Sequence, residues 1–352
     1  MKIRHTLIAS ALLTALSAQA QTSITVYGNA DIAYNNLVTT ASTGIKTEEN
    51  NIVAGGLSTS NIGFRGDRQI TPGLKATFQF EFEVDPTADS GVPKTRAGLI
   101  GLSGDYGALT FGRRTTLAKA AIDATDAGDG TNTIGFLGDN ARDSRRNDMM
   151  TFTTPSMAGF SADLQLSFGS PTKITSATGV ISQDGNAEDA NSMGLNYANG
   201  PLTVKWVNES IKNYSKATTV AGYSVAVPTT MASRKNSAIG ATYDFGPAKL
   251  FFVDTKMEQG TAASLVRFDT QTLGVRVPVG NFTFLAEAGT GKAQLTNSAI
   301  KADLNALQLT AMYALAKDTN VYVAYGSETA NHPTFTKKAD QKNMQLGMRY
   351  RF

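Results

Sequence analysis

The sequence lacks cysteine and contains only two histidines among 352 residues. Without cysteine it has no disulfide and no thiolate metal site, so an exported chain of this length must be stabilised by other means. His5 and His332 are too few for a metal site of the histidine and cysteine kind. A Ser-His-Asp triad would depend on His332, which lies beside Pro333 in a polar stretch where a rigid arrangement is hard to hold. The lack of cysteine and the scarcity of histidine argue against an enzyme.

Charge is sparse and nearly balanced, at 32 basic and 29 acidic residues. Two of the basic residues, Lys2 and Arg4, lie at the start of the chain, so the remainder carries 30 against 29. A protein whose main partner is nucleic acid favours a basic excess. The balance therefore argues against nucleic-acid binding, and the sequence calls for no cofactor.

The first twenty residues have the pattern of an export signal. Lys2 and Arg4 give a positive start, residues 6–16 form a short apolar run, and Ala18-Gln19-Ala20 is a small-x-small cleavage site. A membrane-spanning helix needs about 18 or more apolar residues, and this run is too short. We expect a signal peptide over residues 1–20 and a mature protein over residues 21–352.

Beyond residue 20 no apolar run approaches the length of a spanning helix. Alternation with a period of two is present instead, most cleanly where Phe78, Phe80 and Phe82 alternate with polar residues. The last nine residues, Met344-Gln-Leu-Gly-Met-Arg-Tyr-Arg-Phe352, also place apolar residues at every second position. Because alternate residues of a strand point to opposite faces, each segment has one apolar and one polar face. Strands with lipid outside and water inside require this pattern.

Sixteen such segments are expected, and the connections between them alternate in length. Short turns rich in Gly, Pro, Asn and Asp follow the even-numbered segments. The longer, polar connections are residues 35–60, 85–95, 114–145, 169–191, 209–236, 257–269, 289–303 and 327–343. A barrel with short turns on one rim and long loops on the other has this asymmetry. The predicted fold is all-β, a 16-stranded antiparallel transmembrane β-barrel.

A soluble β-sandwich or propeller would alternate in the same way, with its apolar face inward. Three features favour the membrane barrel. The polar faces carry many small residues, the chain ends on Phe352, and no internal repeat of propeller-blade length occurs.

Short segments in a fixed order run along the whole mature chain: Ser23-Ile-Thr-Val-Tyr-Gly28, Ile62-Gly-Phe-Arg-Gly66, Gly73-Leu-Lys-Ala-Thr-Phe-Gln-Phe-Glu81, Gly101-Leu-Ser-Gly104, Gly107-Ala-Leu-Thr-Phe-Gly-Arg113, Gly159-Phe-Ser and Tyr350-Arg-Phe352. Together they resemble the Gram-negative trimeric general porins, most closely those of the betaproteobacterial type. The resemblance implies a homotrimer in the outer membrane and a third loop folded into the lumen as a constriction, at about residues 115–141. In this chain that loop has a helix-compatible stretch, residues 117–122, and four carboxylates: Asp123, Asp126, Asp129 and Asp139.

In the family that the chain resembles, an arginine ladder on the barrel wall faces the acidic loop. Arg96 matches a constriction arginine of the family, and if Ala97, Leu99 and Gly101 face lipid, alternation turns Arg96 to the lumen. Alternation also favours Arg114 over its neighbour, and at least one of the arginines at 142–146 is expected to complete the ladder. The candidate wall residues are Arg65, Arg96, Arg114, Arg142, Arg145 and Arg146.

Two departures from the enterobacterial pattern affect the expected selectivity. A family wall arginine corresponds here to Asn61, and a glutamate of the loop is replaced by Gly135. Losing a carboxylate favours anions, whereas losing an arginine partly cancels that effect. With the arginines at 142–146, we expect a weak preference for anions, since selectivity depends on bore size and lining charge.

The predicted function is a general diffusion porin, a water-filled channel for small hydrophilic solutes and ions. A substrate-specific outer-membrane channel is the alternative, and an adhesive or structural barrel is a third. The partners that the resemblance implies are other copies of the chain, outer-membrane lipid and lipopolysaccharide, and the outer-membrane assembly machinery. In the family the machinery reads the terminal aromatic residue, so Tyr350 and Phe352 are the candidate assembly signal, while Arg349 and Arg351 belong to the strand that closes the barrel.

Overall fold

The computed structural model describes residues 23–88, 93–128, 145–169, 173–175, 181–183, 189–212, 214, 218–220, 223–225, 233–261, 264–295 and 301–352. The expected signal peptide lies outside these residues, as do Asp129, Asp139 and Arg142 of the candidate site. No helix in the described part of the chain is long and apolar enough to cross a membrane.

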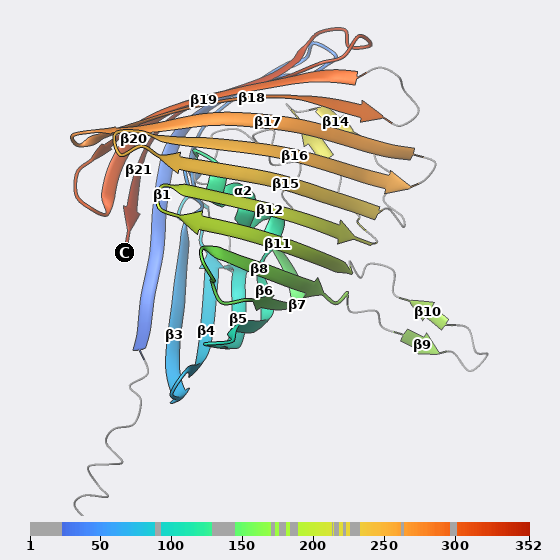
Figure 1. Cartoon of the computed structure of the whole chain (residues 1–352). Helices are drawn as coiled ribbons and strands as arrows, with labels where there is room; N and C mark the ends of the chain where they lie inside the picture. The colour runs from blue at the N-terminus through green and yellow to red at the C-terminus, as the bar shows by residue number, and fades with distance from the viewer. Residues whose placement is uncertain are drawn as a thin grey trace, which may run out of the picture.

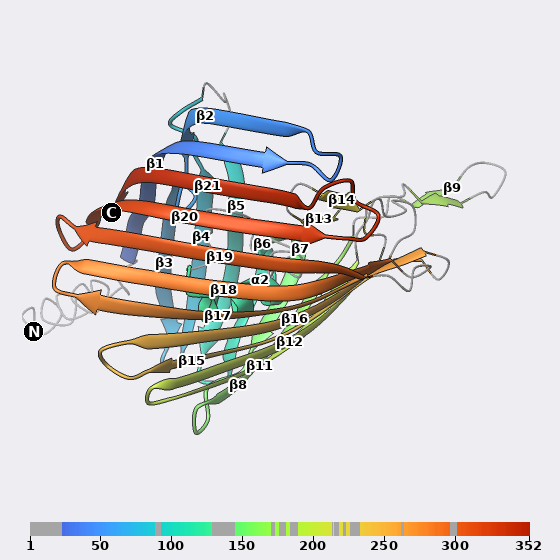
Figure 2. The same cartoon turned by 90° about the horizontal axis from the view of Figure 1, so that it is seen from above.

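One antiparallel sheet of seventeen strands closes on itself as a barrel (Figures 1 and 2). In chain order the strands are β1 (Ser23–Thr40), β2 (Lys46–Ala54), β3 (Asn61–Thr71), β4 (Leu74–Glu83), β5 (Lys94–Gly104), β6 (Gly107–Thr115), β7 (Arg145–Thr153), β8 (Phe160–Ser167), β11 (Ala190–Asn199), β12 (Leu202–Ile211), β15 (Ser233–Asp244), β16 (Lys249–Thr261), β17 (Ser264–Val279), β18 (Phe282–Leu295), β19 (Lys301–Ala314), β20 (Thr319–Asn331) and β21 (Ala339–Arg351). Two short hairpins, β9 (Lys173–Thr175) with β10 (Ile181–Gln183) and β13 (Thr218–Val220) with β14 (Tyr223–Val225), lie outside the sheet, and α2 (Leu117–Thr125) lies inside the barrel.

The barrel has sixteen strand positions because two strands share one. β2 and β3 both pair with β1 on the same side, β2 along its second half and β3 along its first. The other side of β1 pairs with β21, from Asn29 opposite Arg351 to Thr40 opposite Asp340. Each of the sixteen positions is therefore paired on both sides, which is what a strand-built structure needs in lipid, although β2 itself pairs only with β1 among the described strands. The predicted fold class is confirmed.

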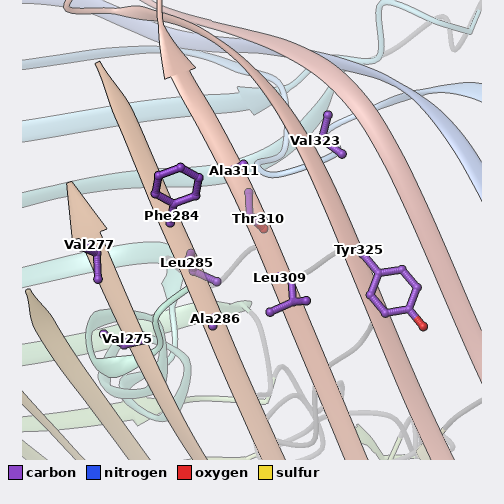
Figure 3. A pocket seen from close by; sticks show the side chains of 10 residues that line it. All are labelled: Val275, Val277, Phe284, Leu285, Ala286, Leu309, Thr310, Ala311, Val323 and Tyr325. Atoms are coloured by element: carbon purple, nitrogen blue, oxygen red, sulfur yellow. The ribbon is translucent and has the colours of Figure 1, made fainter. Parts of the chain in front are cut away.

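The outer surface consists of rows of side chains in register across neighbouring strands. On β17 to β20 one row is Val277, Phe284, Ala311 and Val323, and the next is Val275, Ala286, Leu309 and Tyr325. Figure 3 shows these side chains along a shallow apolar groove. Leu285 and Thr310, which lie between the rows in sequence, are buried on the inner side. Because of this strict alternation, the side chains of the rows form an apolar outer wall, and the side chains between them point into the barrel.

The apolar rows have distinct boundaries at both ends of the barrel. At the short-turn rim, aromatic rings pair across strands, as in Phe160 with Tyr197 and Phe282 with Tyr313. Towards the other rim the outer rows become charged and ion-paired, as in Glu258 with Arg267. An apolar band bordered by aromatic residues is the pattern of a barrel surrounded by hydrocarbon.

Several connections predicted as long loops are in fact strand. Residues 35–60 contain the second half of β1, a tight turn and all of β2; residues 257–269 and 289–303 are largely the ends of β16 to β19. Their pairing continues above the apolar band, where the outer face is charged and the inner face of β16, β17 and β19 carries a buried apolar cluster that includes Met257, Val266 and Phe268. The apolar residues change from the outer to the inner face within one strand, so the alternation expected of a lipid-facing strand stops before the strand ends.

Candidate pore constriction

Helix α2 is seated on the inner wall of the barrel, where it contacts β11, β12, β15 and β16 (Figure 1). Its first turn is capped by Thr116, whose Oγ1 accepts a hydrogen bond from the backbone N–H of Lys119 at 3.2 Å. The buried side of the helix, with Ala118 and Ile122 at its centre, packs on inward-facing Val207, Ala238 and Val253. This apolar contact fixes the helix to one part of the inner wall.

The end of the helix is held by close contacts with two glycines of the wall. A Cβ on Gly240 would lie 1.9 Å from Oγ1 of Thr125, and a Cβ on Gly274 would lie 2.5 Å from Cβ of Ala127. Arg276 donates a hydrogen bond from Nη2 to the carbonyl of Ala127. Only glycine allows the loop to approach the sheet this closely, so these positions set how far α2 lies from the wall.

Asp123 and Asp126 of the loop have different surroundings. Asp123 pairs with Lys119 one turn earlier, at 2.7 Å, on a partly exposed face of α2. Asp126 is buried, and its Oδ1 accepts a hydrogen bond from the N–H of Gly128 at 2.9 Å. Asp123 can act on ions in the lumen, whereas Asp126 shapes the turn after the helix.

Arg96 lies on the inner face of the short strands, between two carboxylates that the sequence reading did not include in the site. Its Nε donates to Glu81 at 2.6 Å and its Nη1 donates to Glu83 at 3.3 Å. Both glutamates follow the polar face predicted opposite the three phenylalanines of β4, so alternation could have found them. The pair with Glu81 is mostly buried, so solvent screens it less than a surface ion pair.

Arg96 reaches the inner face because of a β-bulge and not by the simple alternation that predicted it. Ala97, Leu99 and Gly101 do not face outward, because the exposed large apolar residues of β5 are Ile100, at 65%, and Leu102, at 45%. A β-bulge shifts the register between β4 and β5 so that Glu81 pairs with Ala97 and Phe82 with Thr95. The extra residue in the bulge is Arg96 itself, which is why it reaches the inner face despite the reversed alternation.

Arg65 and Tyr27 form the adjoining part of the same wall. The guanidinium carbon of Arg65 lies 5.1 Å from the centre of the Tyr27 ring. The Tyr27 hydroxyl donates to Oε2 of Glu81 at 3.0 Å and accepts from Nε2 of Gln79 at 2.6 Å. A single network therefore joins the inner faces of β1, β3, β4 and β5.

The remaining described arginines of the ladder divide into two groups. Arg114 donates to Oγ1 of Thr110 at 2.7 Å, and Arg145 lies within electrostatic range of Arg96, Glu81 and Asp123. Arg146, by contrast, forms a buried pair with Glu209, at 3.3 Å between Nη1 and Oε2. Ser192 and Asn236 complete the hydrogen bonding of Glu209. Arg146 therefore links β7 to β12 and is not available to solutes.

The structure thus gathers most of the described candidate residues on one inner wall, with α2 on another. Among the described charged residues that these contacts bring together, five are cationic and four are anionic; Arg276 and Lys205 are further inward-facing cations outside this set. The cations are Arg65, Arg96, Arg114, Arg145 and Lys119, and the anions are Glu81, Glu83, Asp123 and Asp163. Cations and anions in this arrangement give a polar, water-accessible restriction with a small positive excess.

Comparison with known proteins agrees with this geometry. A sequence model of the family described as Gram-negative porin matches residues 6–333. The chain belongs to the Gram-negative porin family. Its relatives include an outer membrane porin protein of Bordetella pertussis, 28% identical and matched over 99% of this chain and 100% of the relative. Outer membrane porin protein 32 of Delftia acidovorans is 28% identical over 91% of this porin and 88% of its own length. The protein is an outer-membrane porin, and its fold and family are those of a channel.

Solved structures share the architecture. An anion-selective porin from Comamonas acidovorans superposes with a TM-score of 0.72 at 22% identity, covering 94% of this porin and 100% of that chain. The trimer form of OmpT from Vibrio cholerae gives a TM-score of 0.70 at 14% identity, with 94% and 99% coverage. At these identities the likeness shows the fold, and the chemistry of the lumen must be argued from this chain's own residues.

Proposed function

We propose that this porin conducts small hydrophilic solutes and ions passively and prefers anions weakly. The observation that carries the preference is the small cationic excess at the restriction, where Glu81 and Glu83 offset Arg96, whereas Arg65 stacks on Tyr27 and Arg114 donates to the Thr110 hydroxyl. Bore size and lining charge determine selectivity in a water-filled pore, so a small excess supports a small preference. The anion selectivity named for the Comamonas structure is consistent with this proposal.

A planar bilayer with different salt concentrations on its two sides tests the proposal. The reversal potential is expected to have the sign of anion selectivity, at a small fraction of the value for a perfectly selective pore. A clearly cation-selective sign would overturn the preference. Saturable block by a single solute would favour a substrate-specific channel, and a barrel that does not conduct would favour an adhesive or structural role. We infer no catalytic activity.

We further propose that the protein assembles as a homotrimer through the outer faces of β3 to β7. Large apolar side chains cover this region: Phe64, Phe80, Ile100, Phe111 and Phe152 are all more than a third exposed. The strands here end without the ion-paired outer rows found on β16 to β19. An outer face that is apolar across its centre, with charge only towards the strand ends at Arg68 and Arg113, suits contact with another subunit better than contact with a lipid headgroup layer.

The remaining proposals concern export and assembly. We propose that residues 1–20 are removed as a signal peptide, that the charged outer rows contact lipopolysaccharide, and that Phe352 is read by the assembly machinery.

The backbone N–H of Phe352 donates to the Gly28 carbonyl at 3.1 Å, and the Gly28 N–H donates to the Phe352 carbonyl at 2.9 Å. Phe352 therefore also completes the closure of the barrel. Deleting it is expected to reduce the inserted amount more than the conductance of inserted channels, and normal insertion would contradict this role.

A further inference from the structure

Between β2 and β3 the chain leaves the wall of the barrel and folds against its inner surface. We call residues 55–60 the inner lip. Gly55 has a φ of 78°, which favours glycine, and a Cβ on Gly56 would lie 2.2 Å from the Tyr322 hydroxyl. Leu57 is only 5% exposed and packs with Ala33, Tyr322 and Ala324, whose side chains face inward. The lip is therefore a packed part of the lumen.

Asp31 fastens the inner lip to the wall. Its Oδ2 accepts hydrogen bonds from the N–H groups of Leu57, at 3.1 Å, and Ser58, at 2.8 Å. Its Oδ1 accepts from the Tyr322 hydroxyl at 2.6 Å, and the residue is fully buried. Two backbone donors and a phenol on one carboxylate leave it well satisfied, as a buried charge must be.

A second side chain fixes the part of the lip that faces the passage. Nδ2 of Asn29 lies within hydrogen-bond distance of the Ser58 carbonyl, Oγ of Ser58 and the Thr59 carbonyl, at 3.2, 2.6 and 3.1 Å. Ser58 and Thr59 remain partly exposed, whereas Gly56, Leu57 and Ser60 are buried. The exposed surface of the lip is thus made of neutral, hydrogen-bonding groups.

The lip and α2 lie on opposite sides of the barrel. The lip rests on β1 and β20, while α2 rests on β11 to β16, about half of the strand order away. The lip also borders the arginine wall, because the Ser60 carbonyl accepts from the N–H of Val84, next to Glu83, the partner of Arg96. It therefore lies beside the charged restriction.

From this arrangement we infer that the inner lip is a second edge of the constriction, which narrows the passage opposite α2 and presents Ser58 and Thr59 to passing solutes. Asp31, Asn29 and Tyr322 are positioning residues that hold it. The inference rests on the proposed channel function. It adds a neutral boundary to a restriction whose other two sides, α2 and the arginine wall, are charged.

The absence of cysteine makes a direct test possible. A Ser58→Cys variant is treated in planar bilayers with thiol reagents that add a positive or a negative charge. We expect either adduct to lower the single-channel conductance, and the reversal potential to move towards anion selectivity with the positive adduct and towards cation selectivity with the negative one. The matched control is Glu48→Cys, on the outer face of β2, where labelling should change neither quantity.

The outcomes distinguish a failure of the lip inference from a failure of the proposed channel function. If the unmodified protein fails to conduct, the proposed function fails; if it conducts normally and labelled Ser58→Cys behaves like unlabelled protein, the lip inference is overturned. A Tyr322→Phe variant checks the fastening, because it removes the bond to Asp31 but keeps the ring. Its open-channel current noise should rise, whereas Tyr325→Phe, on the outer face of the same strand, should match the parent. Equal noise in the two variants would contradict the positioning role.

Discussion

Two halves of this barrel are built differently. The short wall, β4 to β8, has strands of 8 to 11 residues, and the tall wall, β16 to β20, has strands of 13 to 16 (Figure 1). Outside, the short wall is rich in phenylalanine, while the tall wall has apolar rows (Figure 3) followed by ion-paired ones. Inside, the short wall carries Arg96, Arg114 and Arg145, and α2 is packed across the passage on β11 to β16.

The difference shows how one sheet can serve two environments. A wall that must cross lipid and then stand in a headgroup layer needs polar pairs above the apolar band, as in Arg267 with Glu258. A wall covered by another subunit would need no such extension. The inner faces differ for a separate reason: one side provides apolar side chains on which α2 packs, and the other holds guanidinium groups by hydrogen bonds to carboxylates and hydroxyls.

The largest expected effect comes from breaking the buried pair between β7 of the short wall and β12, which lies between the two walls. Glu209 is 1% exposed and Arg146 is 5% exposed, so Glu209→Ala removes a carboxylate from a buried guanidinium. We expect a loss of about 3–5 kcal/mol in the free energy of unfolding. Denaturant unfolding in detergent measures it. Glu258→Ala removes an exposed pair on the tall wall and should cost about 1 kcal/mol or less; equal losses in both variants would contradict the comparison.

Unseating α2 is the next test. Ile122→Ala removes buried apolar contact with Val207, Ala238 and Val253 and is expected to cost about 2–5 kcal/mol locally. Because this contact holds the loop on the inner face of β12 to β16, the single-channel conductance of the variant should be larger, or its open-channel current noisier. Ile239→Ala, on the outer face of β15, shortens the same kind of side chain without touching the helix. If both variants conduct like the parent, the helix is not the element that narrows the passage.

Charges placed on the two outer faces are expected to have a smaller effect on stability, and they test which face forms the subunit contact. Phe80→Arg places a charge on the short wall and Phe252→Arg places one on the tall wall, and each should cost about 2–4 kcal/mol where it meets hydrocarbon. Only Phe80→Arg is expected to abolish the trimer band on an unheated SDS gel. Loss of the trimer in Phe252→Arg alone would move the subunit contact to the tall wall.

The sequence predicts the features that repeat and misses those that depend on single irregularities. Alternation identified the closing strand and the outward-facing Phe78, Phe80 and Phe82, because each strand has one apolar face. It reversed the faces of β5, since one extra residue at Arg96 shifts the register and leaves no mark in composition. The inner lip was read as part of a polar loop for a similar reason: its position depends on Asp31 and Tyr322, which are 291 residues apart.

The most direct test of the account compares two arginines of opposite faces. Arg96→Gln removes a lumenal charge and releases Glu81 and Glu83, whereas Arg267→Gln removes a charge from the outer face of the tall wall. The reversal potential in a salt gradient is the measurement. We expect Arg96→Gln to shift it towards cation selectivity and Arg267→Gln to leave it at the parent value. No shift in Arg96→Gln, or equal shifts in both, would contradict a charged constriction on the short wall.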